Sequence, residues 1–192
     1  IAKYDVGDYF LNLHPKLLDG CDSCLEKNIR PLTALGLKAY MPLSMVDEER
    51  YKNNSMGTLL TPINKRNSET DISINILITK RRITASPQDR VKRVLSSSAK
   101  SVSDLGGFDK YNYNENSFEY VGEFSGESLV ISCFGIFDGG ACNTSFNIFK
   151  NGTFDGEIEF VFDLKDAKYF FSINAYVNAI VKSMIEEKGG GS

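Results

Sequence analysis

The sequence predicts a single α+β domain in which an antiparallel β-meander of about four to six strands packs against a long C-terminal amphipathic helix, with helical segments near the N-terminus. Two patterns predict this class: β-prone runs separated by turn residues over 118–162, and one apolar stripe at helical spacing over 170–184. The 192 residues are 42% apolar and 24% charged, which excludes a coiled coil and a wholly disordered chain. We assign residues 1–188 to the domain and read 189–192, Gly-Gly-Gly-Ser, as an engineered linker.

Four β-prone runs make up the predicted meander. They cover residues 118–124, 129–137, 145–149 and 154–162. The second run is apolar on both faces, which is typical of a central strand. Asn151-Gly152 separates the last two runs and is a strong hairpin signal, because both residue types tolerate a positive φ. The last run alternates apolar and acidic residues, so we expect one buried and one solvated face.

The final segment is predicted to be a helix. Its apolar residues recur at positions i, i+3, i+4 and i+7, as on one face of an α-helix. The helix should pack on the apolar face of the meander, because each needs a partner layer. We therefore expect one set of helix residues to be buried against Ile131, Phe160 and Phe162: Phe170, Ile173, Val177, Ile180 and Met184.

The first hundred residues show weaker patterns. Isoleucines alternate over 72–78 and predict a strand, and a proline opens a short basic helix over 87–100. A short helix is expected over 22–32, where a proline limits its length. Residues 40–70 read as loop, and the Ser-, Gly- and Asn-rich residues 96–117 read as a mobile connection.

Charge is distributed unevenly along the chain. Residues 1–63 carry 7 basic and 8 acidic groups, 64–100 carry 9 and 3, and 101–192 carry 6 and 14. One interpretation is that the basic stretch 80–93 recognises an anionic surface such as nucleic acid, a sulfated glycan or lipid. The other is that it neutralises the acidic residues of 155–163 or is simply solvated. The candidate binding residues are Arg81, Arg82, Arg90, Lys92 and Arg93.

The four cysteines allow three interpretations. An even count favours two disulfides among Cys21, Cys24, Cys133 and Cys142, and a bond between the last two would close the loop between them. Alternatively, Cys21 and Cys24 form a Cys-x-x-Cys redox centre at a helix start, although Asp22 would raise the pKa of a neighbouring thiol and oppose reactivity. Zinc binding by all four is the third interpretation, but the second pair is spaced more widely than in structural zinc sites.

Residues 134–140, Phe-Gly-Ile-Phe-Asp-Gly-Gly, resemble the metal-binding turn of PP2C-type phosphatases, whose pattern is close to FGVFDGHGG. The resemblance implies that Asp138 would hold metal ions. The family's histidine is missing here, and the chain that follows is too short for the family's later metal-binding aspartates. A degenerate relative of these phosphatases is therefore one alternative function.

The stretch from Cys24 to Leu37 resembles the N-terminal region of takeout and juvenile-hormone-binding proteins. The resemblance implies a secreted lipid carrier with an N-terminal cysteine pair and long helices wrapped by an antiparallel sheet. The order of elements here, a helix, a meander and a long amphipathic helix, is compatible with that architecture.

Catalytic motifs are sparse, and no cofactor is implied. His14 is the only histidine, and no nucleophile elbow, Walker loop or dinucleotide fingerprint accompanies it. N-glycosylation sequons occur at Asn53, Asn143 and Asn151, and the last two fall in predicted turns.

These observations favour a non-catalytic, extracellular binding domain without a transmembrane segment. It would engage a protein partner or a small apolar ligand held between helix and sheet. The alternatives are a thiol–disulfide oxidoreductase that uses Cys21 and Cys24, and the degenerate phosphatase relative.

Overall fold

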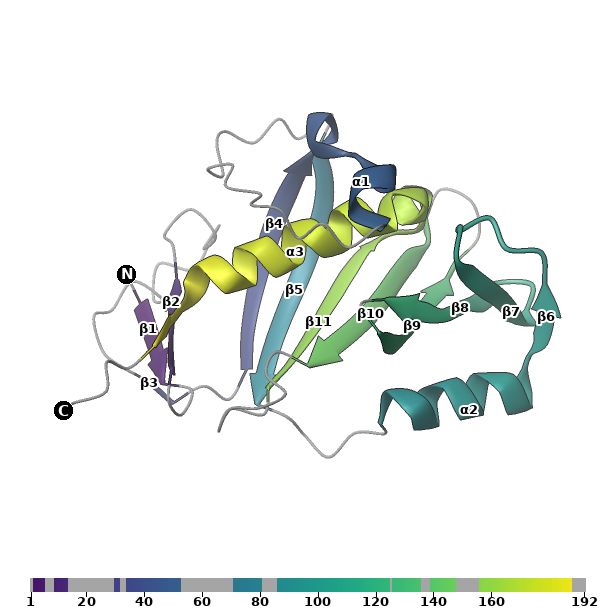
Figure 1. The fold of residues 1–192 in the computed structure, drawn as a ribbon, viewed down its shortest axis with the longest axis horizontal. Helices are drawn as coiled ribbons and strands as arrows, with labels where there is room; N and C mark the ends of the chain where they lie inside the picture. The colour runs from purple at the N-terminus through teal and green to yellow at the C-terminus, as the bar shows by residue number, and fades with distance from the viewer. Residues whose placement is uncertain are drawn as a thin grey trace.

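The computed structural model describes residues 2–5, 9–13, 30–31, 34–52, 71–80, 86–124, 126–135, 139–147 and 156–187. They form two sheets, and a long C-terminal helix crosses the larger one (Figure 1). The larger sheet is antiparallel throughout, and its eight strands lie in the order β4-β5-β11-β10-β9-β8-β7-β6. Its strands are β4 (Ala34–Pro42), β5 (Asp71–Lys80), β6 (Ala99–Ser101), β7 (Phe108–Asn114), β8 (Ser117–Phe124), β9 (Glu127–Phe134), β10 (Ala141–Asn147) and β11 (Gly156–Asp163).

The four predicted runs correspond to β8, β9, β10 and β11, which form an antiparallel meander as expected. Strands β6 and β7 extend this meander to six strands from residues that were predicted to be a mobile connection. The sheet is larger than predicted because β5 pairs with β11 and β4 pairs with β5 on the far side. A second, four-stranded sheet joins the two ends of the described chain in the order β12-β2-β1-β3. Its strands are β1 (Ala2–Asp5), β2 (Tyr9–Leu13), β3 (Arg30–Pro31) and β12 (Ile185–Glu187).

Helix α3 (Phe170–Met184) covers one face of the larger sheet and follows directly from the 3-10 helix η5 (Leu164–Tyr169). The five helix residues expected in the core are all buried and belong to one cluster with Ile131, Phe160 and Phe162. The rings of Phe162 and Phe170 lie 6.4 Å apart, so helix and sheet are in direct contact. The predicted docking of the C-terminal helix is confirmed, and we call this covered side the inner face.

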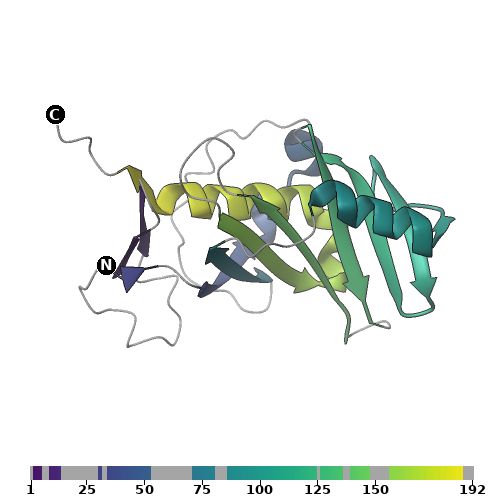
Figure 2. The ribbon, with the colours of Figure 1, turned by 90° about the horizontal axis from the view of Figure 1, so that it is seen from below.

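Helix α2 (Pro87–Ser97) lies on the opposite, outer face, along the β7–β9 part of the sheet and apart from α3 (Figure 1). Seen from below, it lies in front of the green strands (Figure 2). Ser86 caps its first turn by accepting the Asp89 N–H at 3.1 Å, and Pro87 occupies the first turn as predicted. Val94 is fully buried beneath the helix. The predicted basic helix is therefore present, although it ends at Ser97 and not at residue 100.

The structure corrects three expectations for the less regular segments. Residues 96–117, predicted to be a mobile connection, contain strands β6 and β7. Phe108 and Tyr111 anchor β7 to the rest of the domain, because one ring is buried on each face of the sheet. The predicted loop over 40–70 begins instead with the end of β4, the 3-10 helix η3 (Leu43–Met45) and α1 (Glu48–Lys52). The predicted helix 22–32 contains strand β3 near its end, and its earlier residues lie outside the described part of the chain. The same is true of the Asn151-Gly152 turn and of residues 189–192.

Candidate functional site

Two arginines of α2 reach down to carboxylates on the outer face of the sheet. Arg90 donates to the Ser145 hydroxyl and, at 2.7 Å, to the Glu157 carboxylate. Arg93 donates to Glu119 at 3.3 Å. The interpretation that the basic segment neutralises the acidic half is therefore supported for Arg90, which is turned toward the sheet.

Of the five candidate basic residues, the structure describes Arg90, Lys92 and Arg93. Lys92 and Arg93 are exposed, although Arg93 also contacts the Glu119 carboxylate, and Arg90 pairs with Glu157. Arg81 and Arg82 lie outside the described residues. Recognition of an anionic partner by this segment stays a prediction.

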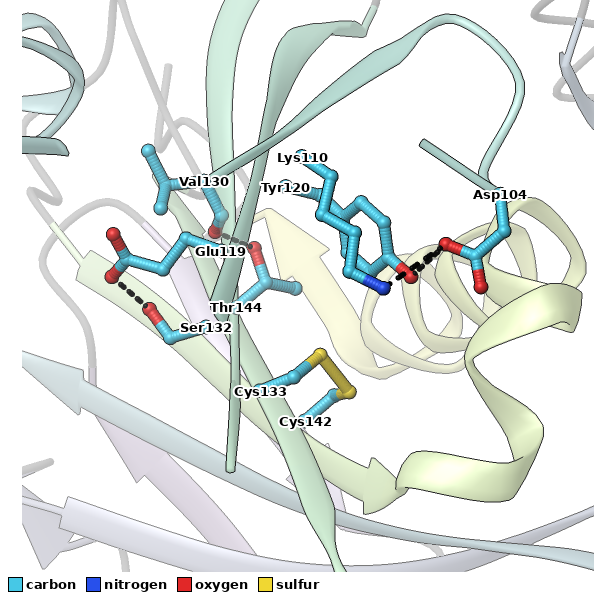
Figure 3. Close-up of a disulfide and its surroundings, with 9 residues drawn as sticks. All are labelled: Asp104, Lys110, Glu119, Tyr120, Val130, Ser132, Cys133, Cys142 and Thr144. Carbon is cyan, nitrogen blue, oxygen red and sulfur yellow. Dashed lines mark hydrogen bonds and ion pairs between the residues drawn. A yellow bond between two sulfur atoms is a disulfide. The ribbon is translucent and has the colours of Figure 1, made fainter. Parts of the chain in front are cut away.

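Glu119 is the centre of the polar network on the outer face. Its carboxylate is buried and accepts a hydrogen bond from the Ser132 hydroxyl at 2.7 Å (Figure 3). It also accepts one from the Tyr113 hydroxyl at 2.7 Å, besides the Arg93 contact. A buried carboxylate is costly unless donors surround it, so this set of three donors accounts for its position. Phe118 and Tyr120 on either side point to the inner face, and the alternation of β8 therefore turns Glu119 outward.

Three partly exposed side chains surround this buried carboxylate. The exposed fractions are 38% for Tyr113, 54% for Phe134 and 63% for the Arg93 side chain. Phe134 lies two residues beyond Ser132 on β9, and Ser132 is the cross-strand partner of Glu119. Diagonal neighbours of this kind are separated by about 7–8 Å, so Phe134 borders the Glu119 network. We call Arg93, Tyr113 and Phe134 the aromatic–arginine patch.

A disulfide fixes the strand end that presents Phe134. Cys133 and Cys142 are direct cross-strand partners in β9 and β10, and the bond between them is buried (Figure 3). The sequence left the pairing of the cysteines open, and the structure shows this one of the possible bonds. Disulfides persist in oxidising compartments, so the bond fits a location outside the cytoplasm.

Glycines close the turn that follows Phe134. Gly135 has a φ of +118°, and a Cβ there would lie 2.3 Å from the Gly140 Cα. The Gly135 N–H donates to the Asn116 carbonyl at 2.9 Å, which ties the end of β9 to the β7–β8 turn. Gly135 and Gly140 of the phosphatase-like stretch thus have a packing role here, and Asp138 lies outside the described residues.

A second polar cluster lies at the inner side of β7 and β8. Tyr120 donates to Asp104 at 2.5 Å, and Lys110 lies 3.6 Å from the same carboxylate (Figure 3). The Lys110 ammonium also lies 4.1 Å from the centroid of the Phe118 ring. Burial, together with the bond to Asp104, raises the pKa of Tyr120 above its ordinary value. The tyrosine therefore stays protonated and serves as a structural donor that holds the turn before β7.

Of the remaining residues singled out in the sequence, the structure describes Asn143. Asn143 lies within β10 and not in a turn, because its amide donates to Glu159 at 3.4 Å and the adjacent Thr144 is buried. The following residues lie outside the described part of the chain: Cys21, Cys24, His14, Asn53 and Asn151.

The described residues contain no group of three or more His, Cys, Asp or Glu placed to hold a metal ion. Within the same residues, no helix combines the length and apolar character needed to cross a membrane.

Sequence reasoning missed Glu119, Tyr113 and Phe134. One signal was present: a glutamate between two aromatic residues in a strand predicts a charge on the face opposite the core. The other members come from different strands and from α2, so only the pairing of strands brings them together.

Comparison with known proteins supports the fold alone. No protein-family model and no curated protein matches the sequence. The chain is similar in structure to the iron-regulated outer membrane lipoprotein FrpD of Neisseria meningitidis, with a TM-score of 0.52, 13% sequence identity, and coverage of 95% of this chain and 91% of that one. At this identity the similarity shows a shared α+β architecture.

Proposed function

We propose that this protein is a non-catalytic protein-binding domain of an oxidising compartment and that the aromatic–arginine patch contacts its partner. The proposal rests on Phe134, a phenyl ring that is 54% exposed although its strand, β9, has a hydrogen-bonded strand on each side. Tyr113 and Arg93 lie on the same face, and tyrosine and arginine are enriched among residues that dominate binding energies. Hydrophobic and planar side chains grouped in this way favour a protein surface as the partner.

The patch is held in place before any partner binds. Glu119 orients Tyr113 and Arg93 through hydrogen bonds, and the Cys133–Cys142 disulfide lies next to Phe134 along β9. Ordering a flexible side chain on binding costs about 0.5–1.5 kcal/mol, so side chains already fixed retain more of their contact energy.

The structure also bears on the choice between a protein partner and an apolar ligand. Side chains of the domain itself fill the layer between α3 and the sheet, where the Phe160 and Phe162 ring centroids lie 6.0 Å apart and Phe170 packs beside them. We therefore favour a protein partner on the outer face over a lipid between helix and sheet.

The proposed location is the cell envelope or the exterior. The buried disulfide supports it, and so does the structural similarity to an outer membrane lipoprotein. Labelling with a thiol reagent in intact producing cells, followed by a gel-shift measurement, should find Cys133 and Cys142 unreactive until a reductant is added. The oxidoreductase and phosphatase alternatives depend on Cys21, Cys24 and Asp138 and stay predictions.

The binding function is tested by cross-linking at the patch. In one variant a photoreactive amino acid replaces Ser117, the cross-strand partner of Phe134. In a control variant it replaces Val102, which is 92% exposed and directly follows β6, outside the patch. The protein trapped at position 117 but not at 102 is identified by mass spectrometry, purified, and titrated against this domain by calorimetry.

Phe134→Ala should weaken that binding about 30-fold, which corresponds to about 2 kcal/mol and is typical of an anchor residue. Val102→Ala is the matched control, because it truncates an exposed apolar side chain outside the patch, and it should leave the affinity unchanged. Both side chains are exposed, so thermal melts of both variants should match the parent. Equal affinities for the two variants, or equal trapping at both positions, would refute the proposal.

A further inference from the structure

The outer face of β4 and β5 is left open beside α2. Three residues of β4 and two of β5 are exposed there: Ala34, Gly36, Lys38, Asn75 and Leu77. Leu77 is 39% exposed although β5 has a hydrogen-bonded strand on each side. We call these five residues the open sheet face; β11 borders it on the side toward α2.

Opposite charges lie at two corners of this face. The strand register places Lys38, Asn75 and Val161 side by side in one row across β4, β5 and β11. The next row on the same face contains Gly36, Leu77 and Glu159. Lys38 lies over the ring of Tyr40, and no carboxylate of the described residues pairs with it. The Glu159 carboxylate accepts one long hydrogen bond, from the Asn143 side-chain amide at 3.4 Å, and no cation among the described residues contacts it.

The register gives the distance between these charges. Neighbouring strands are about 4.8 Å apart and two residues of a strand span about 6.8 Å, so Lys38 and Glu159 are separated by about 12 Å in the plane of the sheet. That distance is too long for an ion pair within one chain. The midpoint between them falls on β5, between Asn75 and Leu77.

A two-fold axis through that midpoint, lying in the plane between two facing sheets, makes the open sheet face complementary to itself. The operation that places Lys38 of one copy opposite Glu159 of the other also forms the reciprocal pair. The same operation carries Leu77 to within about 3 Å, in the plane, of the position above Gly36 of the second copy.

Gly36 is suited to receive that leucine. A Cβ built on it would meet nothing within 4 Å, so the surface above it is open. The charge pair and the leucine over glycine are therefore related by one symmetry operation, and each occurs twice in the pair of molecules.

We propose that the open sheet face binds a second copy of this chain in a two-fold symmetric dimer, with Lys38 facing Glu159 and Leu77 seated on Gly36 across the interface. The face is small compared with standard interfaces of about 800 Å² per partner, so the dimer is weak, with a dissociation constant in the micromolar range. The inference is independent of the proposed partner at the aromatic–arginine patch.

Sedimentation equilibrium from about 1 µM to about 500 µM tests the dimer directly. The parent protein should associate reversibly, and Gly36→Val should weaken association at least about tenfold by filling the space that Leu77 needs. Because that space is empty in one copy, the Gly36→Val monomer should keep the circular dichroism spectrum of the parent. Val102→Ala, which lies away from this face, should dimerise like the parent.

A charge-reversal pair identifies the two-fold arrangement. Lys38→Glu and Glu159→Lys should each weaken self-association at least about tenfold, because each places like charges opposite one another. An equimolar mixture of the two variants should dimerise again. In the mixed dimer the two substituted side chains lie opposite one another with opposite charges, and the unaltered Lys38 of one variant lies opposite the unaltered Glu159 of the other. A parent that stays monomeric throughout the range, or variants whose mixture does not associate, would overturn the proposal.

Discussion

Replacing Glu48 with alanine should lower the free energy of unfolding by about 3 kcal/mol, because this residue of α1 caps a different helix. Its carboxylate accepts the backbone N–H groups of Phe171 at 3.1 Å and Ser172 at 2.9 Å, and the Ser172 hydroxyl at 2.5 Å. These donors belong to the first turn of α3, whose N–H groups have no partner within the helix.

The magnitude follows from the burial of those donors. Phe171 and Ser172 are both buried, so water does not replace the lost acceptor freely. A buried donor left without a partner costs about 1–3 kcal/mol, and a lost helix cap typically costs about 1 kcal/mol. Two backbone donors and one hydroxyl therefore amount to about 3 kcal/mol, which for a chain of this length lowers the melting temperature by about 6–12 °C.

Urea denaturation followed by circular dichroism measures the effect, with an unchanged m-value showing that the loss is one of stability. Glu48→Gln keeps an acceptor oxygen but loses the charge, so it should cost about 1 kcal/mol. Glu123→Ala removes an exposed carboxylate of β8 and should change stability by less than about 0.5 kcal/mol. If Glu48→Ala unfolds within about 0.5 kcal/mol of the parent, the cap does not stabilise α3 and the reasoning fails.

Three further outcomes are expected. Replacing both Cys133 and Cys142 with alanine should cost about 2.5 kcal/mol, the chain entropy of a short closed loop, in urea denaturation, and an unchanged midpoint would argue against this. Burial, with a smaller contribution from Asp71, raises the pKa of Tyr176 to about 12; the unfolded tyrosine ionises near pH 10, so stability present below about pH 10 is lost as the pH rises toward 12. Tyr176→Phe should make this alkaline loss shallower in pH-dependent melts, and identical slopes would contradict it. Val177→Asp places an unpaired charge in the core layer and should cost about 4 kcal/mol or more, so an unchanged melting temperature would show that α3 is not docked there.

Elements with strong local periodicity were predictable from the sequence. Strand β11 buries one face, so its apolar residues recur with a period of two. The apolar residues of helix α3 recur with a period of about three and a half, although residues 170–177 are buried on every side. Strand β7 lies near the edge of the sheet and buries only Phe108 and Tyr111, which face opposite sides and leave no alternation to detect.

Strand β4 was missed although its inner residues alternate correctly. The intervening positions include Gly36, a poor strand former, and the strand ends at Pro42. Its place in the sheet depends on pairing with β5, which no local pattern of β4 specifies.

The candidate site was the least predictable part of the protein. Glu119 is buried only because Ser132, Tyr113 and Arg93 come to it from β9, β7 and α2. A sequence shows which strands exist more readily than which residues face one another across them, and a one-residue change of register would remove every one of these contacts.

The small sheet determines how the molecule would respond to mechanical force. Strands β1 and β12 both pair with β2 in the antiparallel sense, so they run parallel to each other on its two sides. Tension applied between Ala2 and Glu187 acts along the two strands in opposite directions and shears their hydrogen bonds against β2, so that the bonds share the load instead of opening one after another. A domain held at one end and pulled at the other would therefore resist extension through this sheet before the larger one is loaded, and its lifetime under force would depend on the rate at which β2 is released.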